Sequence, residues 1–149
     1  MKNKLKQELK ESMLAKDELR TSVLRLLLSA INYMEIQKGG AGYEATDEDV
    51  VSVIQKEVKQ RKDSIEQFKN AKREELAEKE EKELEILNKY LPEQMGEEEV
   101  TALIKEAIKE TGAASITDMG KVMGALMPKI KGKADGNLVS QIVRKELTQ

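Results

Sequence analysis

Apolar side chains return at helical spacing through most of this chain, and that spacing constrains its fold more than any other feature. Leu5, Leu9 and Met13 recur at every fourth position near the start. A wider apolar face follows them, formed by Leu19, Val23, Leu24, Leu27, Leu28, Ile31 and Met34. This spacing is typical of amphipathic helices that bury one face. Strong helix formers dominate the 149 residues and only two are proline, so we predict an all-α fold.

Several residues mark where the predicted helices begin and end. Asp17 is placed to cap the helix that carries the wide apolar face, and the glycines from Gly39 to Gly42 end it. Thr46, followed three residues later by Asp49, forms a capping box with Asp in place of the usual Glu. We therefore expect a second long helix from about Thr46 through Phe68.

The segment between Phe68 and Leu84 is dominated by charged residues of both signs. It contains one large apolar side chain, Leu76. Glu residues precede Lys by four positions in three favourable pairs: Glu75 with Lys79, Glu78 with Lys82, and Glu85 with Lys89. Because the two signs are interleaved, we interpret the segment as an exposed, solvated helical hairpin or arm, although a role in binding a partner stays open.

A junction near Pro92 divides the predicted helices into two groups. Tyr90-Leu91-Pro92 stops the preceding apolar stripe, since proline disfavours helix in the residue before it. We predict an N-terminal helical bundle or hairpin domain over residues 1–92, a linker from Pro92 to Gly96, and a small three-helix domain over residues 93–149. Its helices are expected to end at Gly112, to run from about Thr117 to Ile130, and to start at Asp135.

The chain lacks the side chains of many common active sites. It contains no Cys and no His, which excludes thiol nucleophiles, imidazole acid/base chemistry and ordinary zinc sites. The two Gly-Lys steps are followed by Val122 and Ala134 and do not form a phosphate-binding loop. We predict no catalytic residue, no metal and no cofactor. With no apolar run long enough for a membrane helix or signal peptide, we expect a cytoplasmic location and no membrane partner.

Charge is distributed unevenly along the second predicted domain. Residues 93–118 carry a net charge of -5, whereas residues 119–149 carry a net charge of +4. The basic part holds Lys121, Lys129, Lys131, Lys133 and Arg144, and it also contains glycines at 120, 124, 132 and 136. One interpretation is that the lysines offset a helix dipole and that Gly120 and Gly124 let two helices approach. The other is a phosphate-contacting surface in which Gly120, Gly124, Gly132 and Gly136 permit close backbone approach beside the N-terminus of the Asp135 helix.

The sequence from Asp118 to Leu147 resembles the C-terminal tail domain of the B subunit of the tRNA-dependent amidotransferase. Together with the junction YLPEQM, Tyr90 to Met95, and the helical first domain, the chain resembles the free-standing YqeY proteins of the GatB/YqeY family. The matching features are Gly120 with Gly124, the loop KGKADG from Lys131 to Gly136, and the Leu-Pro junction. Similarity to the amidotransferase is confined mainly to the last third of the chain.

The resemblance implies contact with tRNA or another structured RNA through Lys121, Lys129, Lys131, Lys133 and Arg144. It implies no catalytic residue, because the catalytic centres of the amidotransferase lie in other domains and subunits. We therefore expect a non-catalytic tRNA-binding or translation-associated accessory protein, with translation or amidotransferase proteins as candidate protein partners.

Two alternatives stay open. The first is a protein-interaction module that uses the charged arm around residues 73–85. The second is an accessory component of glutamine-dependent tRNA amidation, with carbon-nitrogen ligase activity and glutamine as the amide donor. All four aromatic residues precede residue 119, so recognition of RNA should depend on its backbone and shape.

Overall fold

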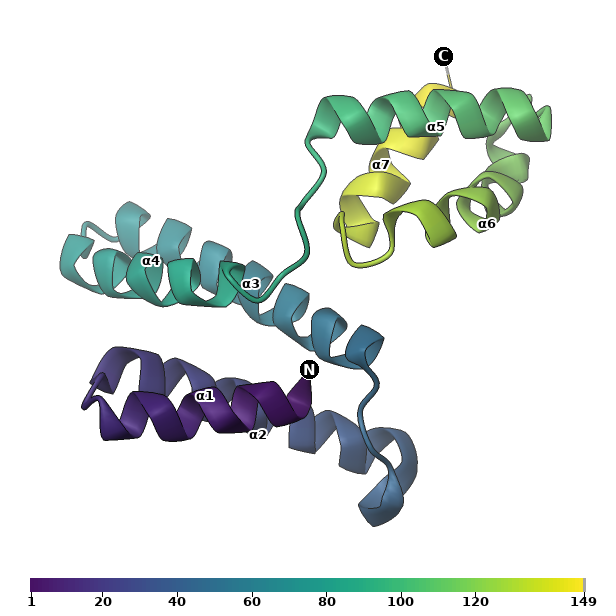
Figure 1. The fold of residues 1–149 in the computed structure, drawn as a ribbon. Coiled ribbons are helices and arrows are strands. Elements are labelled where there is room, and N and C mark those ends of the chain that lie inside the picture. The colour runs from purple at the N-terminus through teal and green to yellow at the C-terminus, as the bar shows by residue number, and fades with distance from the viewer. Residues whose placement is uncertain (149) are drawn as a thin grey trace. The chain divides into compact units, whose positions relative to one another are not determined.

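The computed structural model describes residues 1–148 and is all-α, with seven α-helices and no strand in that range (Figure 1). The all-α prediction is therefore confirmed. Internal contacts divide the chain into two compact units, one of residues 1–91 and one that begins at Pro92. We call them the N-terminal unit and the C-terminal unit. Their independence as folding domains stays a prediction.

The N-terminal unit consists of four helices, α1 (Lys2–Leu14), α2 (Glu18–Gly39), α3 (Asp47–Asn70) and α4 (Glu74–Asn88), with a short 3-10 turn at Gly40–Gly42. α1 lies alongside α2 (Figure 1), and α2 also packs on α3 and α4. The core is formed by apolar residues of all four helices, among them Leu5, Leu24, Ile31, Ile54 and Leu87. The helix with the widest apolar face, α2, therefore lies at the centre of this core, as its sequence predicts.

The predicted helix boundaries in this unit are confirmed. The Asp17 carboxylate accepts a hydrogen bond from the backbone N–H of Arg20 at 3.0 Å. Thr46 and Asp49 form the reciprocal capping box, with each side chain accepting from the backbone N–H of the other. Gly40 has a φ of 74°, a left-handed conformation that favours glycine, directly after α2 ends.

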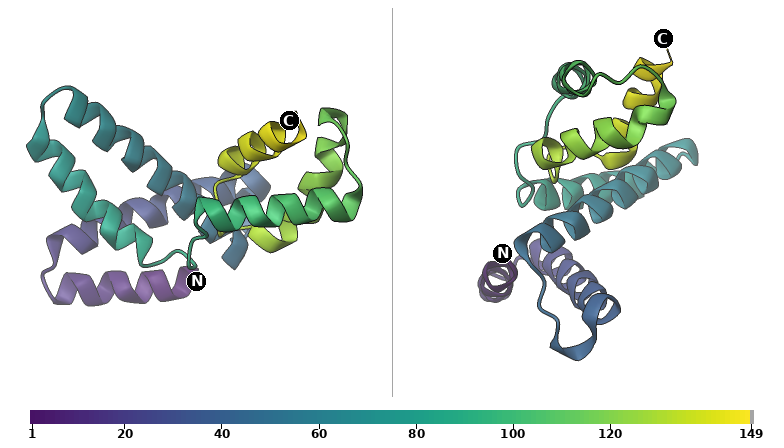
Figure 2. Two further views of the ribbon diagram at one scale, coloured as in Figure 1. Left: turned by 90° about the horizontal axis from the view of Figure 1, so that it is seen from above. Right: turned by 90° about the vertical axis from the view of Figure 1, so that its right-hand side faces the viewer.

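The charged segment between Phe68 and Leu84 belongs to a helical hairpin, as predicted, and most of its residues are exposed. α3 and α4 form a hairpin, whose turn lies at the far left of the left-hand view in Figure 2, and they pack closely along their lengths. Arg61 of α3 is buried and forms ion pairs with Glu80 and with buried Glu83 of α4. Lys69 pairs across the hairpin with Glu81 at 2.6 Å. The ion pairs of Arg61 and Lys69 thus cross between helices, whereas the sequence pattern predicted pairs along one helix.

The C-terminal unit consists of three helices, α5 (Glu97–Thr111), α6 (Met119–Ile130) and α7 (Gly136–Leu147), as predicted. Gly112 ends α5 in a left-handed conformation with φ of 67°, and a 3-10 turn at Ile116–Asp118 leads into α6. Val100, Ile104, Val122, Leu126 and Val139 are among the fully buried residues of its core. The three helices enclose a single apolar core that carries no buried charge among the described residues.

Candidate nucleic-acid interface

The predicted basic loop is a tight turn between α6 and α7. The backbone N–H of Lys131 donates to Met127 O at 3.0 Å, and that of Lys133 donates to Ile130 O at 2.8 Å. Gly132 lies between them with a φ of 78°, a conformation that a side chain would strain. The glycine at 132 is thus required by the turn itself. The lysines at 129, 131 and 133 are all exposed.

Residues of the predicted linker hold this loop in place. The Gln94 side-chain amide donates to Gly132 O at 2.9 Å and to Pro92 O at 2.8 Å. The backbone N–H of Met95 donates to Lys133 O at 2.9 Å. Three bonds therefore engage the segment that precedes α5, and two of them fix carbonyls of the loop. Gln94 was not predicted to be a positioning residue from the sequence, although it lies in the YLPEQM junction.

The five predicted RNA-contacting residues do not form one cluster. Lys129, Lys131 and Lys133 gather at the end of α6, but Lys121 lies in the first turn of that helix. The eight residues between Lys121 and Lys129 correspond to about 12 Å along the helix axis. Arg144 lies in the last turn of α7, again about 12 Å along its helix from Gly136. The basic loop therefore carries three of the five predicted residues, with Lys121 and Arg144 placed apart from it.

The N-terminus of α7 already carries a carboxylate. Asp135 is the N-cap, as predicted, and its side chain accepts from the backbone N–H of Asn137 at 3.0 Å. This carboxylate complements the helix dipole and adds a negative charge where a phosphate would bind. The N-terminus of this helix is therefore a poorer anion site than the sequence suggested, and attraction for phosphate must come from the lysine side chains.

The glycines on α6 leave an open backbone surface. A Cβ atom added at Gly120, Gly124 or Gly136 would meet no heavy atom within 4 Å among the residues that the structure describes. These glycines therefore do not serve close packing of helices inside the C-terminal unit, which was one of the two interpretations of the pattern. Approach of a partner's backbone to this surface stays a prediction.

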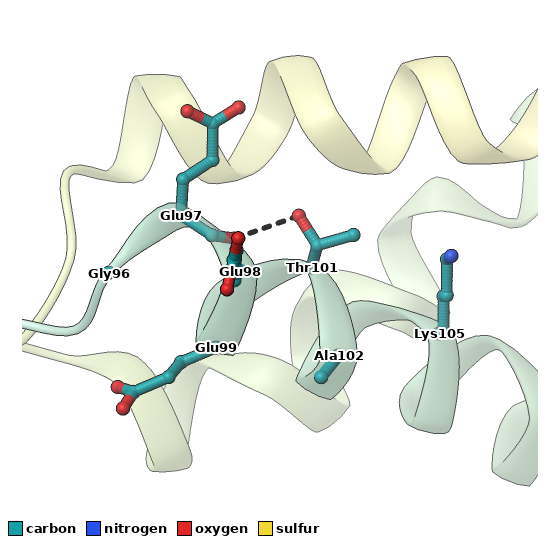
Figure 3. Close-up of a pocket in the computed structure, with 7 residues that line it drawn as sticks. All are labelled: Gly96, Glu97, Glu98, Glu99, Thr101, Ala102 and Lys105. Carbon is teal, nitrogen blue, oxygen red and sulfur yellow. Dashed lines mark hydrogen bonds between the residues drawn. The ribbon is translucent and has the colours of Figure 1, made fainter.

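Acidic residues lie close to the basic loop in space. The hydrogen bonds from Gln94 and Met95 bring the loop next to the first turn of α5, where Glu97, Glu98 and Glu99 are exposed. These three residues line a shallow depression together with Gly96, Thr101, Ala102 and Lys105 (Figure 3). The acidic and basic segments that are separate in the sequence thus meet at one end of the C-terminal unit. The surface around the three lysines therefore carries both signs of charge.

Asp118 fixes the other end of α6. Its carboxylate accepts from the backbone N–H of Ala114 at 3.0 Å and lies 3.9 Å from Lys121 Nζ. The hydrogen bond from the Ala114 N–H, together with one from Ser115, holds the pKa of Asp118 below its usual value. Lys121 consequently has a charged neighbour of its own, and this weakens its availability for a phosphate.

The fold and this site define a class of protein: an all-α chain of two helical units with a lysine-bearing loop. Comparison with known proteins gives the family. Residues 2–147 match the family described as Yqey-like protein, and the chain belongs to that family. The family resemblance inferred from the residues is thereby confirmed, whereas the specific link to the tail of the amidotransferase B subunit stays a prediction.

Among the similar proteins are fungal ones that carry the name altered inheritance of mitochondria protein 41, mitochondrial. The chain is 37% identical to the Pyrenophora tritici-repentis protein over 95% of the chain and 77% of that protein. It is 42% identical to the Lachancea thermotolerans protein and 40% identical to that of Saccharomyces cerevisiae strain S288c, over 58% of the chain in both cases. The chain spans 46% of the length of each of these two yeast proteins. Neither the names nor the family description states a catalytic activity.

The expectation of a cytoplasmic location is wrong by this comparison, because the relatives are named as mitochondrial proteins. That expectation depended on the lack of an apolar signal-peptide core and of a membrane helix. Mitochondrial targeting segments are amphipathic and need neither feature, so their absence had no bearing on that compartment. Among residues 1–148, none of the helices has the length and apolar character needed to cross a membrane.

Proposed function

We propose that this chain is a non-catalytic accessory protein that binds structured RNA, with tRNA as the first candidate, through phosphates contacted by Lys129, Lys131 and Lys133. The observation that carries the proposal is the anchoring of the basic loop by Gln94 and Met95. A loop with fixed carbonyls holds the backbone that carries the lysines, so less backbone entropy is lost when a ligand binds. Lys121 and Arg144 are peripheral in this proposal.

The absence of aromatic residues in this part of the sequence favours recognition of the RNA backbone over base stacking. If three lysines each neutralise one phosphate, log affinity falls with log salt at a slope of about -2.1 to -2.7. The neighbouring Glu97, Glu98 and Glu99 favour an RNA surface that approaches the loop from the side of α6, where Gly124 leaves the backbone open.

The test is a titration of an unmodified tRNA transcript at several salt concentrations, followed by fluorescence anisotropy. Lys129, Lys131 and Lys133 are changed together to Glu. The matched control carries the same charge change on exposed lysines of the N-terminal unit, Lys56, Lys62 and Lys79. We expect the loop variant to lose binding and the control to lose little. Equal loss in both variants, or no binding of the parent chain at low salt, contradicts the proposal.

The alternative of a charged arm that docks a partner protein is less favoured. Glu80, Glu81 and Glu83 are engaged with Arg61 and Lys69 of α3, so these charges stabilise the hairpin. A pull-down with and without nuclease separates the two functions. Loss of the co-purifying proteins after nuclease treatment supports RNA binding, whereas their retention supports direct protein contacts.

A further inference from the structure

Methionine is the side chain of this protein that peroxides should oxidise most readily, because the chain has seven methionines and no cysteine or tryptophan. Reaction at a methionine requires that the oxidant reach its sulfur. Met13 is 49% exposed, whereas Met127 is 40% and Met1 is 36% exposed. The other four are partly buried and pack on the cores of the two units: Met34, Met95, Met119 and Met123. Met13 is therefore the most exposed methionine of the chain.

The sulfur of Met13 also has a cation beside it. Arg25 of α2 donates through Nη2 to Met13 Sδ at 3.8 Å. Met13 lies in the last turn of α1, so this contact joins the two helices close to the turn between them. A thioether is a weak acceptor, so the contact contributes little in the reduced protein. Both residues line a shallow groove in which Lys16 and Glu18 are also exposed, so a small peroxide can reach the sulfur.

We propose that Met13 is an oxidation site whose sulfoxide is bound by the Arg25 guanidinium. In this reaction a lone pair of the sulfur attacks one oxygen of a hydroperoxide and the O–O bond breaks. The proton of the transferred oxygen passes to the leaving oxygen, which departs as water or as an alcohol. The thioether is oxidised to a sulfoxide and the peroxide is reduced.

The sulfoxide changes the contact with Arg25. Its oxygen is a polar acceptor, and the donor that already contacts the sulfur is charged. The weak contact to sulfur thus becomes a charge-assisted hydrogen bond, a class of bond that is roughly twice as strong as one between neutral groups. Oxidation should therefore hold the last turn of α1 more firmly against α2.

This stabilising effect is the opposite of the usual result of methionine oxidation. A sulfoxide inside a core is a buried polar group and disrupts packing, which is the outcome expected at Met34. Met13 is exposed, so its sulfoxide keeps much of its hydration. Two residues of α1 are buried, Leu5 and Ser12, so few contacts hold its last turn and one added bond there should be measurable. The site lets the chain react with peroxide without loss of its fold.

The test uses the full chain with Met127→Leu, which increases the lead of Met13 in exposure over the remaining methionines. Dilute hydrogen peroxide is added until the mean mass has risen by one oxygen atom, and peptide mass spectrometry locates that oxygen. We expect it at Met13 ahead of Met34. Amide hydrogen exchange in the last turn of α1 should then slow by about two- to tenfold, the range that corresponds to one hydrogen bond.

Two further variants separate the role of Arg25 from a general effect of charge. Arg25→Ala removes the donor, and Lys16→Ala is the matched control because it removes another cation of the same groove. Circular dichroism checks that both variants are folded. Oxidation should leave exchange in α1 unslowed in Arg25→Ala, whereas the slowing should persist in Lys16→Ala. The proposal is overturned if Met34 is oxidised before Met13, if oxidation does not slow exchange in α1, or if the slowing survives Arg25→Ala.

Discussion

In the N-terminal unit charged side chains join different helices, whereas in the C-terminal unit the described ion pair of Lys121 with Asp118 stays within one turn. Lys2 of α1 pairs with Glu35 of α2 at 2.6 Å, and Lys38 of α2 pairs with Asp49 of α3 at 2.6 Å. Arg61 connects α3 to α4 from a buried position. The buried set of the C-terminal unit is apolar in the described residues.

The two units therefore use charged side chains differently. In the N-terminal unit they connect helices, and in the C-terminal unit they lie on the surface of an apolar core. Several charges of the N-terminal unit are paired between helices, so removal or titration of one partner should change its stability. Lys129 and Lys133 of the basic loop are exposed, so their replacement should change stability little. Surface ion pairs contribute little, so only buried pairs should give a large effect.

The largest effect is expected from Arg61→Ala. It leaves the Glu83 carboxylate buried without its partner and should lower the free energy of unfolding of the N-terminal unit by about 3 to 5 kcal/mol. Urea denaturation measures this loss, and Lys129→Ala in the C-terminal unit serves as the control, with a change within about 0.5 kcal/mol. Arg61→Met combined with Glu83→Leu should recover most of the loss. If Arg61→Ala lowers the free energy of unfolding no more than Lys129→Ala does, the two units do not differ in how much their charges contribute to stability.

The second prediction tests whether the two units unfold separately. Leu126 is fully buried in the core of the C-terminal unit, and Leu126→Ala should destabilise that unit by about 2 to 5 kcal/mol through the cavity it creates. Hydrogen exchange followed by mass spectrometry should show faster exchange in α5, α6 and α7 with α1 to α4 unchanged. Leu27→Ala, in the core of the N-terminal unit, should instead give faster exchange in α1 to α4 with α5, α6 and α7 unchanged. Faster exchange throughout the chain in both variants indicates a single cooperative unit.

A smaller effect is expected at Gly124, which lies inside α6 facing open space. Gly124→Ala should stabilise the C-terminal unit by about 0.5 to 1 kcal/mol, because alanine favours helix over the unfolded chain. Thermal unfolding measures the gain. Gly112→Ala is the control and should cost about 1 to 2 kcal/mol, since its positive φ strains a side chain. A stabilised Gly124→Ala variant that binds tRNA less well would show that the open backbone contacts the ligand.

The smallest effect concerns pH and the N-terminal unit alone. The hydrogen bond from Lys2, together with one from the Ala45 N–H, holds the pKa of Glu35 below its ordinary value of 4.5. A carboxylate with a lowered pKa contributes stability above the unfolded value and loses it as the pH falls through the folded value. The unfolding free energy should therefore fall below about pH 4.5 in the parent chain. Glu35→Gln should weaken this dependence, and an unchanged pH profile would contradict the role of this pair.

Much of the fold could be predicted from the sequence because local patterns determine it. The caps at Asp17, Thr46 and Asp135 and the stops at Gly40 and Gly112 all lie where the residues indicated. The i, i+4 pattern of α4 did not indicate its cross-helix ion pairs: in the described part of the chain Glu80 and Glu83 pair with Arg61, and Glu81 pairs with Lys69, all on α3. Interleaved charge has the same pattern in a solvated helix and in a paired hairpin, so no local signal identified Arg61.

The candidate site was predicted less completely. The basic loop and its glycine at 132 could be read from the residues, but the five cations could not be placed relative to one another. The bonds from Gln94 and Met95 to the loop join residues that are nearly forty positions apart. Those bonds also bring Glu97 to Glu99 beside the lysines, so the charge separation seen along the chain is not a separation in space.

The sequence by itself determined the helical class, the ends of the helices and the absence of thiol and imidazole chemistry, because these depend on single residues and near neighbours. Only the tertiary structure decided which charges are buried, which lysines gather on one loop, and that Leu26, Tyr33 and Ile36 of α2 are exposed. Those properties depend on contacts between distant segments, and an apolar residue at helical spacing has the same pattern whether it faces a core or solvent.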